Sequence, residues 1–258
     1  MSENASNVSA VERTILILEE LSSHPGINLE DFAKACDLPK ATLYRFLQTL
    51  TTLGYVRRDE NDRYSLTLRM FSIGSSSLEY TDLLSVSRPV AQKLSDLTGE
   101  TVHIGMLEKT RAVYVLKIES AHTIRMFSRV GKHIPLHCTA IGKILISEMD
   151  KNARHELYEQ IHGKNKNFDK YTENTLITDA ALDKELESVK LSGYGRDREE
   201  HELGITCIGA PIRDVSGKII AAMSVSFPCF RFPEEKADEI ISAVKNAALE
   251  ISCAMGYK

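Results

Sequence analysis

The sequence predicts an α+β protein of two domains, and three observations support this class. Over residues 1–70, apolar residues recur at helical spacing and then begin to alternate, which predicts a small helical domain ending in a hairpin. From Glu100 onward, short alternating stretches predict strands, and the helical segments between them follow no regular alternation. That order is typical of a sheet with helices packed on its faces. A chain of 258 residues is long enough to give each domain its own core.

Composition excludes several classes of protein. Hydrophobic residues make up 43% of the chain and charged residues 26%, which is ordinary for a globular protein. No run of about 18 apolar residues is present, and the N-terminus lacks the regions of a signal peptide, so we expect no membrane span. Five cysteines without C-x-x-C spacing favour reduced thiols in a cytoplasm over a disulfide framework or a zinc site.

Catalytic motifs are missing from the chain. It contains no G-x-S-x-G, no H-E-x-x-H, no Gly-rich phosphate loop and no G-x-G-x-x-G. We therefore predict that the protein is not an enzyme and has no cofactor or metal. Cys207 is expected to be a small buried residue, and Arg154 and His162 to lie on the polar face of a helix.

Two helices are expected at the start of the first domain. The first has its predicted apolar face on Val8, Val11, Ile15, Leu18 and Leu21, and it ends at His24-Pro25-Gly26. Asn28 is a suitable N-cap for the second helix. The apolar face of that helix is formed by Leu29, Phe32, Ala33 and Cys36.

The stretch Leu38–Arg58 carries four basic residues and no acidic one. Its helical part has one apolar face, made of Leu43, Phe46, Leu47 and Leu50. Its opposite face holds five polar residues suited to the DNA major groove, where Arg, Lys and Gln read base edges and Thr and Tyr contact phosphates: Lys40, Thr42, Tyr44, Arg45 and Gln48. The alternative is a small helical domain with a solvated basic face.

After Gly54 the spacing changes from helical to alternating. Tyr55–Arg58 and Arg63–Leu66 predict a hairpin around a polar turn. Such a hairpin is the wing of a winged helix-turn-helix, which we place at residues 1–67, and it lets Arg57, Arg58 and Arg63 contact phosphates. Eight basic and ten acidic residues among residues 1–70 give a net charge of −2, so the positive charge is a local patch.

A linker helix at residues 68–80 is expected to join this domain to a second one at 81–258. A helix over 82–98 opens the second domain. Strands are predicted at 101–107, 112–118, 124–128, 205–212 and 218–227, and helices at 139–149, 151–161, 180–192 and 233–255.

Three places in the second domain could converge on a ligand. Thr139 stands at a helix start, so the free N–H groups of Ala140 and Ile141 form a small anion site. Asp197 begins a charged loop that extends to Glu202. The hydroxyls of Ser224 and Ser226, two residues apart on a strand, face the same way. Each has a plainer interpretation as a helix cap, a solvated turn or serines bonded to backbone, but their coincidence favours a ligand site.

The chain resembles the IclR family of bacterial transcription regulators. The resemblance rests on LPKATLYRFLQTLTTLGYV, RYSLTLRMFSIG, ETVHIGML, SRVGKHIPLHCTAIGK, GYGRDREEHELGITCIGAPI and AAMSVSFP, which follow the family's order. It departs from the family at Asp37, where Gly is frequent, and at Ala41, where Ser is frequent. The resemblance implies a GAF-like effector domain and homodimers formed through the DNA-binding domains, often paired into tetramers.

The same resemblance implies an effector site. Met126 and Ile134 would form an apolar wall, and Ala140 and Ile141 would donate backbone N–H groups to a carboxylate. The polar end would be formed, with Ile205 beside it, by Asp197, Cys207, Ser224 and Ser226. These residues include those reached independently from helix ends and strand parity.

Within the family, TLYRFLQTLTTLGYV, YSLTLRMF, RMFSRVGK, SFPCFRF and the ending MGY resemble repressors of pectin and hexuronate catabolism that respond to 2-keto-3-deoxygluconate. We therefore expect a DNA-binding repressor of sugar-acid catabolic genes that a small carboxylate releases from a double-stranded operator. Three alternatives stay open: an activator, a regulator that responds to another organic acid, and a sugar-acid-binding enzyme.

Overall fold

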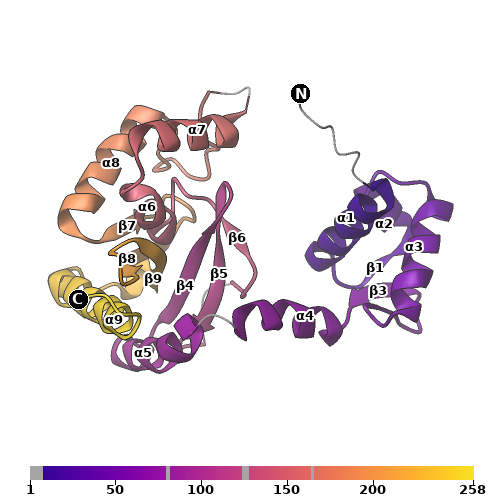
Figure 1. Ribbon diagram of the computed structural model, residues 1–258, viewed down its shortest axis with the longest axis horizontal. Coiled ribbons are helices and arrows are strands. Elements are labelled where there is room, and N and C mark those ends of the chain that lie inside the picture. Colours follow the sequence, from indigo (N-terminus) through magenta and orange to yellow (C-terminus); the bar gives the residue numbers. More distant parts are fainter. Residues whose placement is uncertain (1–7, 80–81, 124–127, 164–165) are drawn as a thin grey trace. The chain divides into compact units, whose positions relative to one another are not determined.

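The computed structural model describes residues 8–79, 82–123, 128–163 and 166–258. They belong to two compact units, Met1–Thr81 and Asp82–Lys258, and each is described by itself. Figure 1 shows the elements of both units along the chain. Among the described residues, no helix is long and apolar enough to cross a membrane.

The first unit contains four helices and a three-stranded sheet in its described part. The helices are α1 (Ser9–Ser23), α2 (Leu29–Ala35), α3 (Lys40–Thr52) and α4 (Leu68–Glu79). The strands are β1 (Ile27–Asn28), β2 (Val56–Arg58) and β3 (Arg63–Leu66), in the order β1-β3-β2. The β2–β3 pairing, with Val56 opposite Leu66, confirms the predicted wing.

Local sequence accounts for the turns of this unit. The Asn28 side chain accepts hydrogen bonds from the N–H groups of Glu30 and Asp31, which confirms the predicted cap of α2. Asp37 has φ of 50°, a left-handed conformation that Asp tolerates, so the turn into α3 forms without Gly. The two-residue strand β1 was not predicted, because so short a pairing leaves no periodic signal.

The predicted apolar face of the first helix is wrong for three residues. Val8, Val11 and Ile15 are 65%, 59% and 49% exposed, whereas Ile17 and Leu21 are buried in the core of the unit. Apolar residues occur on more than one side of α1, so periodicity alone does not tell which side packs.

A six-stranded antiparallel sheet forms the centre of the second unit, in the order β6-β5-β4-β9-β8-β7. Its strands are β4 (Thr101–Glu108), β5 (Arg111–Ile118), β6 (His133–Ile134), β7 (Gly195–Arg198), β8 (Ile205–Arg213) and β9 (Ile219–Pro228). The four longer strands confirm their predictions. The strands β6 and β7 were missed, and most of the strand predicted at 124–128 falls outside the described residues.

Helices cover both faces of this sheet, as Figure 1 shows. One face packs against α5 (Asp82–Thr98) and α9 (Ala237–Ala254), which follows the short 3₁₀ turns Cys229–Arg231 and Glu234–Lys236. The other face packs against α6 (Ala140–Ser147), with α7 (Lys151–His162) and α8 (Asp179–Ser192) outside it. These bounds confirm the predicted helices within a few residues at each end.

Close packing places the start of α6 against the rest of the unit. A Cβ on Gly142 would lie 2.4 Å from the Leu136 Cα, so the close approach of this segment requires glycine. On β7, a Cβ on Gly195 would lie 3.0 Å from the Ala140 carbonyl oxygen. The helix N-terminus is therefore fixed directly over the sheet.

The placement predicted for Arg154 and His162 is wrong. Arg154 is buried and its Nε lies 3.0 Å from Asp183 of α8. The His162 side chain is largely covered and its Nε2 lies 3.0 Å from Asp179. Polar residues on the inner side of α7 are tolerated because α8 supplies carboxylates to pair with them.

Candidate DNA-binding surface and ligand pocket

Packing of one face of α3 presents the other face to solvent. Leu43, Leu47 and Leu50 are buried in the core of the first unit. Four of the five predicted polar contacts are exposed and Thr42 is half-buried; the exposed ones are Lys40, Tyr44, Arg45 and Gln48. The amphipathic pattern of the helix thus leaves a polar surface that its own folding does not require.

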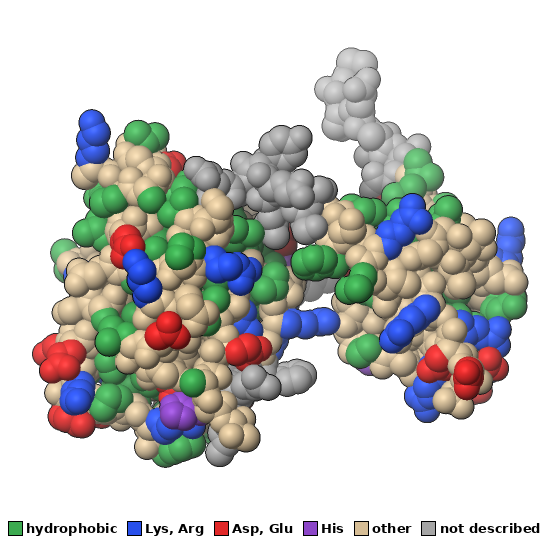
Figure 2. Space-filling view, turned by 90° about the horizontal axis from the view of Figure 1, so that it is seen from below, with side chains coloured by type: hydrophobic (Ala, Val, Ile, Leu, Met, Phe, Trp, Pro, Cys, Tyr) green, Lys and Arg blue, Asp and Glu red, His purple; other side chains and the backbone are tan. Residues whose placement is uncertain are grey.

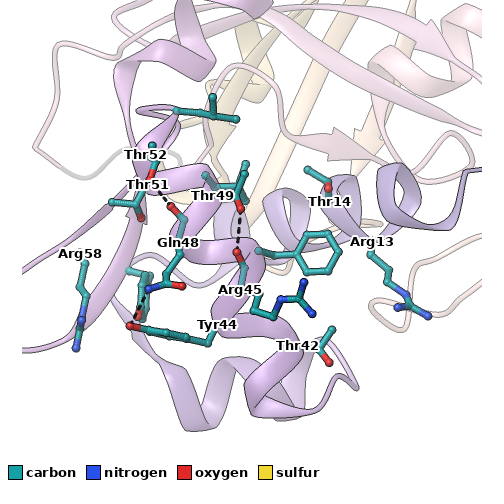
Figure 3. A pocket seen from close by; sticks show the side chains of 14 residues that line it. Arg13, Thr14, Thr42, Tyr44, Arg45, Gln48, Thr49, Thr51, Thr52 and Arg58 are labelled. Carbon is teal, nitrogen blue, oxygen red and sulfur yellow. Dashed lines mark hydrogen bonds between the residues drawn. The ribbon is translucent and has the colours of Figure 1, made fainter.

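This surface is part of a concavity of about 1210 Å³ lined by α1, α3 and the wing. Figure 3 shows Arg58 of the wing and Arg13 of α1 on opposite sides of the α3 side chains. Gln48 Nε2 donates to the Tyr44 hydroxyl at 3.2 Å, which orders both side chains on the α3 surface.

Arg13 was not predicted as part of this surface. It is exposed and lines the concavity together with Thr42 and Arg45. Only the packing of α1 beside α3 brings it there. A single basic residue on the solvent side of a helix gives no signal in the sequence.

The basic residues of the surface differ in their intramolecular partners. Lys40 lies 3.2 Å from Glu30, and Arg58 lies 2.6 Å from Asp62. Arg63 donates to the Gly26 carbonyl at 2.8 Å and so ties the wing to the turn after α1. Among the described residues, nothing forms a side-chain hydrogen bond or ion pair with the guanidinium group of Arg45 or Arg57. These two arginines can contact a ligand without breaking an existing bond.

On the face that Figure 2 shows, both signs of charge occur on each unit. The chain carries 32 basic and 36 acidic residues. Attraction to an anionic polymer therefore depends on the local arginines rather than on the field of the whole molecule.

A small cavity in the second unit collects most of the residues expected to bind a ligand. Seven of the nine line it: Ile134, Ala140, Ile141, Asp197, Ile205, Cys207 and Ser224. Ser226 is buried beside it, with its hydroxyl 3.2 Å from the Cys207 Sγ. Met126 lies outside the described residues. The cavity measures about 20 Å³, room for about one water molecule.

One end of this cavity offers unpaired backbone donors. Thr139 caps α6, and its hydroxyl accepts from the Gly142 N–H at 3.1 Å. No acceptor among the described residues bonds to the N–H of Ala140 or Ile141. Free N–H groups at the positive end of a helix favour an anion, so the geometry is compatible with the anion site that the sequence predicts.

The other end contains an acidic group that is easily protonated. Asp197 was predicted in a loop, but it lies on β7 opposite Cys207, and the chain turns only after Arg198. Burial raises the pKa of Asp197 to about 7, although the Glu200 N–H donates to its carboxylate at 2.8 Å and opposes that rise.

A buried lysine beside the cavity ties α6 to α8, to β7 and to the turn after β7. Lys143 of α6 is fully buried, and its Nζ lies 2.6 Å from Glu200 and 3.1 Å from Glu185. It also donates to the Arg196 carbonyl of β7 at 2.9 Å. Sequence reasoning gave Lys143 no role, because the partners of a buried charge lie 42 and 57 residues away.

Comparison with known proteins identifies the family of the chain. The family model of the bacterial transcriptional regulator IclR C-terminal domain matches residues 75–253, and that of the IclR helix-turn-helix domain matches residues 10–60. The chain belongs to the IclR family. It is therefore a DNA-binding regulator of transcription and not an enzyme.

Several IclR-family relatives align over nearly the whole chain. It is 38% identical to the HTH-type transcriptional regulator KdgR of Escherichia coli over 258 residues, which is 100% of this chain and 96% of that protein. It is also 38% identical to KdgR of Dickeya chrysanthemi, covering 100% of this chain and 83% of the relative. The crystal structure of Thermotoga maritima IclR superposes with a TM-score of 0.77 at 29% identity, covering 97% of this chain and 100% of that one.

The IclR-family assignment gives each surface its general role. The unit that carries α3 and the wing is the DNA-binding domain, and the unit that carries the cavity is the effector-binding domain. The C-terminal domain of Escherichia coli KdgR superposes on 69% of this chain with a TM-score of 0.62 and 37% identity, covering all of that structure.

Proposed function

We propose that this protein represses sugar-acid catabolic genes and leaves its operator when a small carboxylate, such as 2-keto-3-deoxygluconate, binds the second unit. The observation that carries the proposal is the convergence of seven expected residues on one cavity at the free N-terminus of α6. The 38% identity with KdgR over the full chain supports the same pathway class.

The effector would bind with its carboxylate on the N–H groups of Ala140 and Ile141. Two backbone donors at a helix start suit a carboxylate without requiring a buried cation. The polar remainder of the molecule would then lie toward Asp197, Cys207 and Ser224, which line the rest of the cavity.

The small size of the cavity means that effector binding would require a conformational change, which could regulate DNA binding. A six-carbon acid cannot enter a space of about 20 Å³, so its binding requires the lining segments to move apart. An effector shifts DNA affinity only by its differential affinity for two conformations, and typical couplings are about 1–3 kcal/mol. The described conformation would be the one that the effector disfavours.

On DNA, a homodimer would place two copies of α3 in successive major grooves of a pseudo-palindromic operator. Residues on α3 would contact base edges and phosphates, while the wing arginines and Arg13 would contact phosphates on either side. Exposed apolar residues at the start of α1 and on α1 and α4 offer a surface for a second copy: Val8, Val11, Ile15, Leu68, Phe71 and Ile73.

Fluorescence anisotropy tests this function. The protein is titrated onto labelled duplex from upstream of its own gene at one fixed salt concentration, with and without 2-keto-3-deoxygluconate. We expect tight binding that the compound weakens at least fivefold. Ser224→Ala should reduce this response, and Ser216→Ala, in an exposed turn, should leave it intact. Binding that the compound strengthens would favour an activator, and binding that ignores it would exclude this effector.

A further inference from the structure

Four polar side chains of the cavity lining lie outside the set expected from the family: Tyr114, Thr139, His201 and Glu202. Thr139 caps α6 and Glu202 is exposed, which leaves Tyr114 and His201 to be explained. Tyr114 lies on β5, and His201 follows β7, so they come from opposite halves of the sheet. A carboxylate on the α6 N-terminus needs neither of them. Because buried polar groups need hydrogen-bond partners, the ligand is expected to carry further polar groups.

The Tyr114 hydroxyl is held in the cavity as a neutral phenol. Its ring stacks on His103 of β4, with 4.3 Å between ring centroids and 22° between planes. His103 is itself anchored by a hydrogen bond of 2.7 Å between its Nε2 and Ser128. Burial raises the pKa of Tyr114, so the group stays protonated. Its hydroxyl has no hydrogen-bond partner within the described part of the chain.

His201 offers a second neutral group that both donates and accepts. The turn before it is fixed, because the Glu200 carbonyl accepts from Thr175 at 2.7 Å and the Glu199 carbonyl accepts from Thr172 at 2.6 Å. The His201 ring lies against Tyr171, at 5.2 Å between centroids. Burial lowers the pKa of His201, and neither ring nitrogen bonds to any residue that the structure describes.

We propose that Tyr114 and His201 bind hydroxyl groups along the effector chain, so that the cavity selects a polyhydroxylated 2-keto acid over an unsubstituted one. The inference rests on the proposed effector site. A neutral phenol and a neutral imidazole each donate and accept, and a hydroxyl group does both as well, so it can use both functions of each side chain. An effector without hydroxyls would bury these groups unpaired, and sites built to bond hydroxyls reject such analogues strongly.

Isothermal titration of the full-length protein with two matched ligands tests this selectivity. The ligands are 2-keto-3-deoxygluconate and 2-ketohexanoate, which has six carbons and the same keto acid end but no hydroxyls. Tyr114→Phe removes only a hydroxyl, and His201→Phe keeps a ring against Tyr171. The matched controls are Tyr257→Phe, in the C-terminal segment, and His155→Phe, on the exposed side of α7.

The wild type should prefer the hydroxylated acid at least tenfold. Each cavity variant should weaken the binding of 2-keto-3-deoxygluconate about tenfold and change the affinity for 2-ketohexanoate less than twofold. The control variants should change neither affinity. Equal losses for both ligands would show a structural role and overturn the proposal, as would unchanged selectivity. A wild type that binds its operator but neither acid would also overturn it and leave DNA binding intact. Selective binding of the acid without an effect on the operator would overturn the proposed regulation and leave this inference standing.

Discussion

We expect Asp197 to make effector binding depend on pH. Its pKa of about 7, raised by burial, means that the group is a neutral acid below pH 7 and a carboxylate above it. The ionised Asp197 carboxylate would repel the carboxylate of the effector. The nearby Glu200, Glu202 and Cys207 carry no positive charge that could neutralise Asp197. Lys143 is already engaged by Glu200. Affinity should therefore fall as pH rises through 7.

Titration calorimetry at pH 6 and pH 8 measures this dependence. We expect binding at pH 8 to be about tenfold weaker, since a single linked proton changes affinity by at most tenfold per pH unit above its pKa. Asp197→Asn should abolish most of the change, because the amide does not titrate. Burial lowers the pKa of His201, so this group titrates below its ordinary range. A pH dependence that survives in Asp197→Asn would assign the proton to another group.

Lys143 is a second residue whose effect can be measured directly. Lys143→Met leaves Glu200 buried with a carboxylate oxygen that already lacks a partner among the described atoms. Breaking one side of a buried pair costs about 3–5 kcal/mol, so urea unfolding should show a loss of that order. The double variant Lys143→Met/Glu200→Gln should recover part of it, because the buried charge of Glu200 is then removed as well. A loss that is simply additive would mean that the two residues are not coupled.

At the scale of elements, α3 and the wing should contribute differently to DNA binding. Arg45 is centrally placed on α3 and unpaired, so Arg45→Ala should cost about 1–3 kcal/mol on the specific site and relax the choice of base at one position. Arg57→Ala on the wing should weaken all sequences alike and lower the slope of log affinity against log salt by about one. Arg13→Ala should behave as Arg57→Ala does.

Anisotropy with operator and random duplex over a range of salt concentrations separates these effects. Arg88 is an exposed arginine on α5 of the other unit, so Arg88→Ala is the matched control. It should leave the affinity for both duplexes unchanged. If Arg45→Ala leaves operator affinity unchanged, α3 is not the helix that reads bases. If Arg57→Ala changes the preferred base and not the salt slope, the wing enters a groove instead of contacting phosphates.

Long elements could be predicted from the sequence because their periodicity is set by their own residues. The helices α3, α5 and α8 and the strands β4, β5, β8 and β9 fall where spacing and caps place them. By contrast, β6 and β7 exist only through pairing with β5 and β8, so their sequences show little alternation. Asp197 was assigned to a loop for this reason.

The residues of the candidate ligand cavity likewise differ in whether the local sequence could predict them. Ala140 and Ile141 were predictable because a capping Thr139 marks a helix start in the local sequence. Tyr114, His201 and Lys143 were not, since their roles depend on partners brought close by the sheet order. A residue that acts through distant contacts has no local signal that a sequence pattern could detect.

At the scale of the whole molecule, exposed apolar residues on the first unit predict that two copies of the protein associate through this unit. Val11 of α1 and Phe71 of α4 are 59% and 68% exposed, and neither is needed by the core of that unit. Large exposed apolar side chains that cluster mark a protein interface. A homodimer formed through the first unit would cover them and set the spacing between two copies of α3.

Sedimentation velocity of Val11→Glu and Phe71→Glu tests this assembly. A charge placed in an apolar interface should dissociate the dimer at micromolar concentration, while thermal unfolding of the monomer should change little because both positions are exposed. Leu191→Glu, at an 87% exposed position on α8, is the matched control and should sediment as wild type. The two variants should also lose affinity for a two-half-site operator and keep that for a single half-site. Variants that remain dimeric with full operator affinity would place the interface elsewhere, and the exposed residues of α1 and α4 would then need another partner.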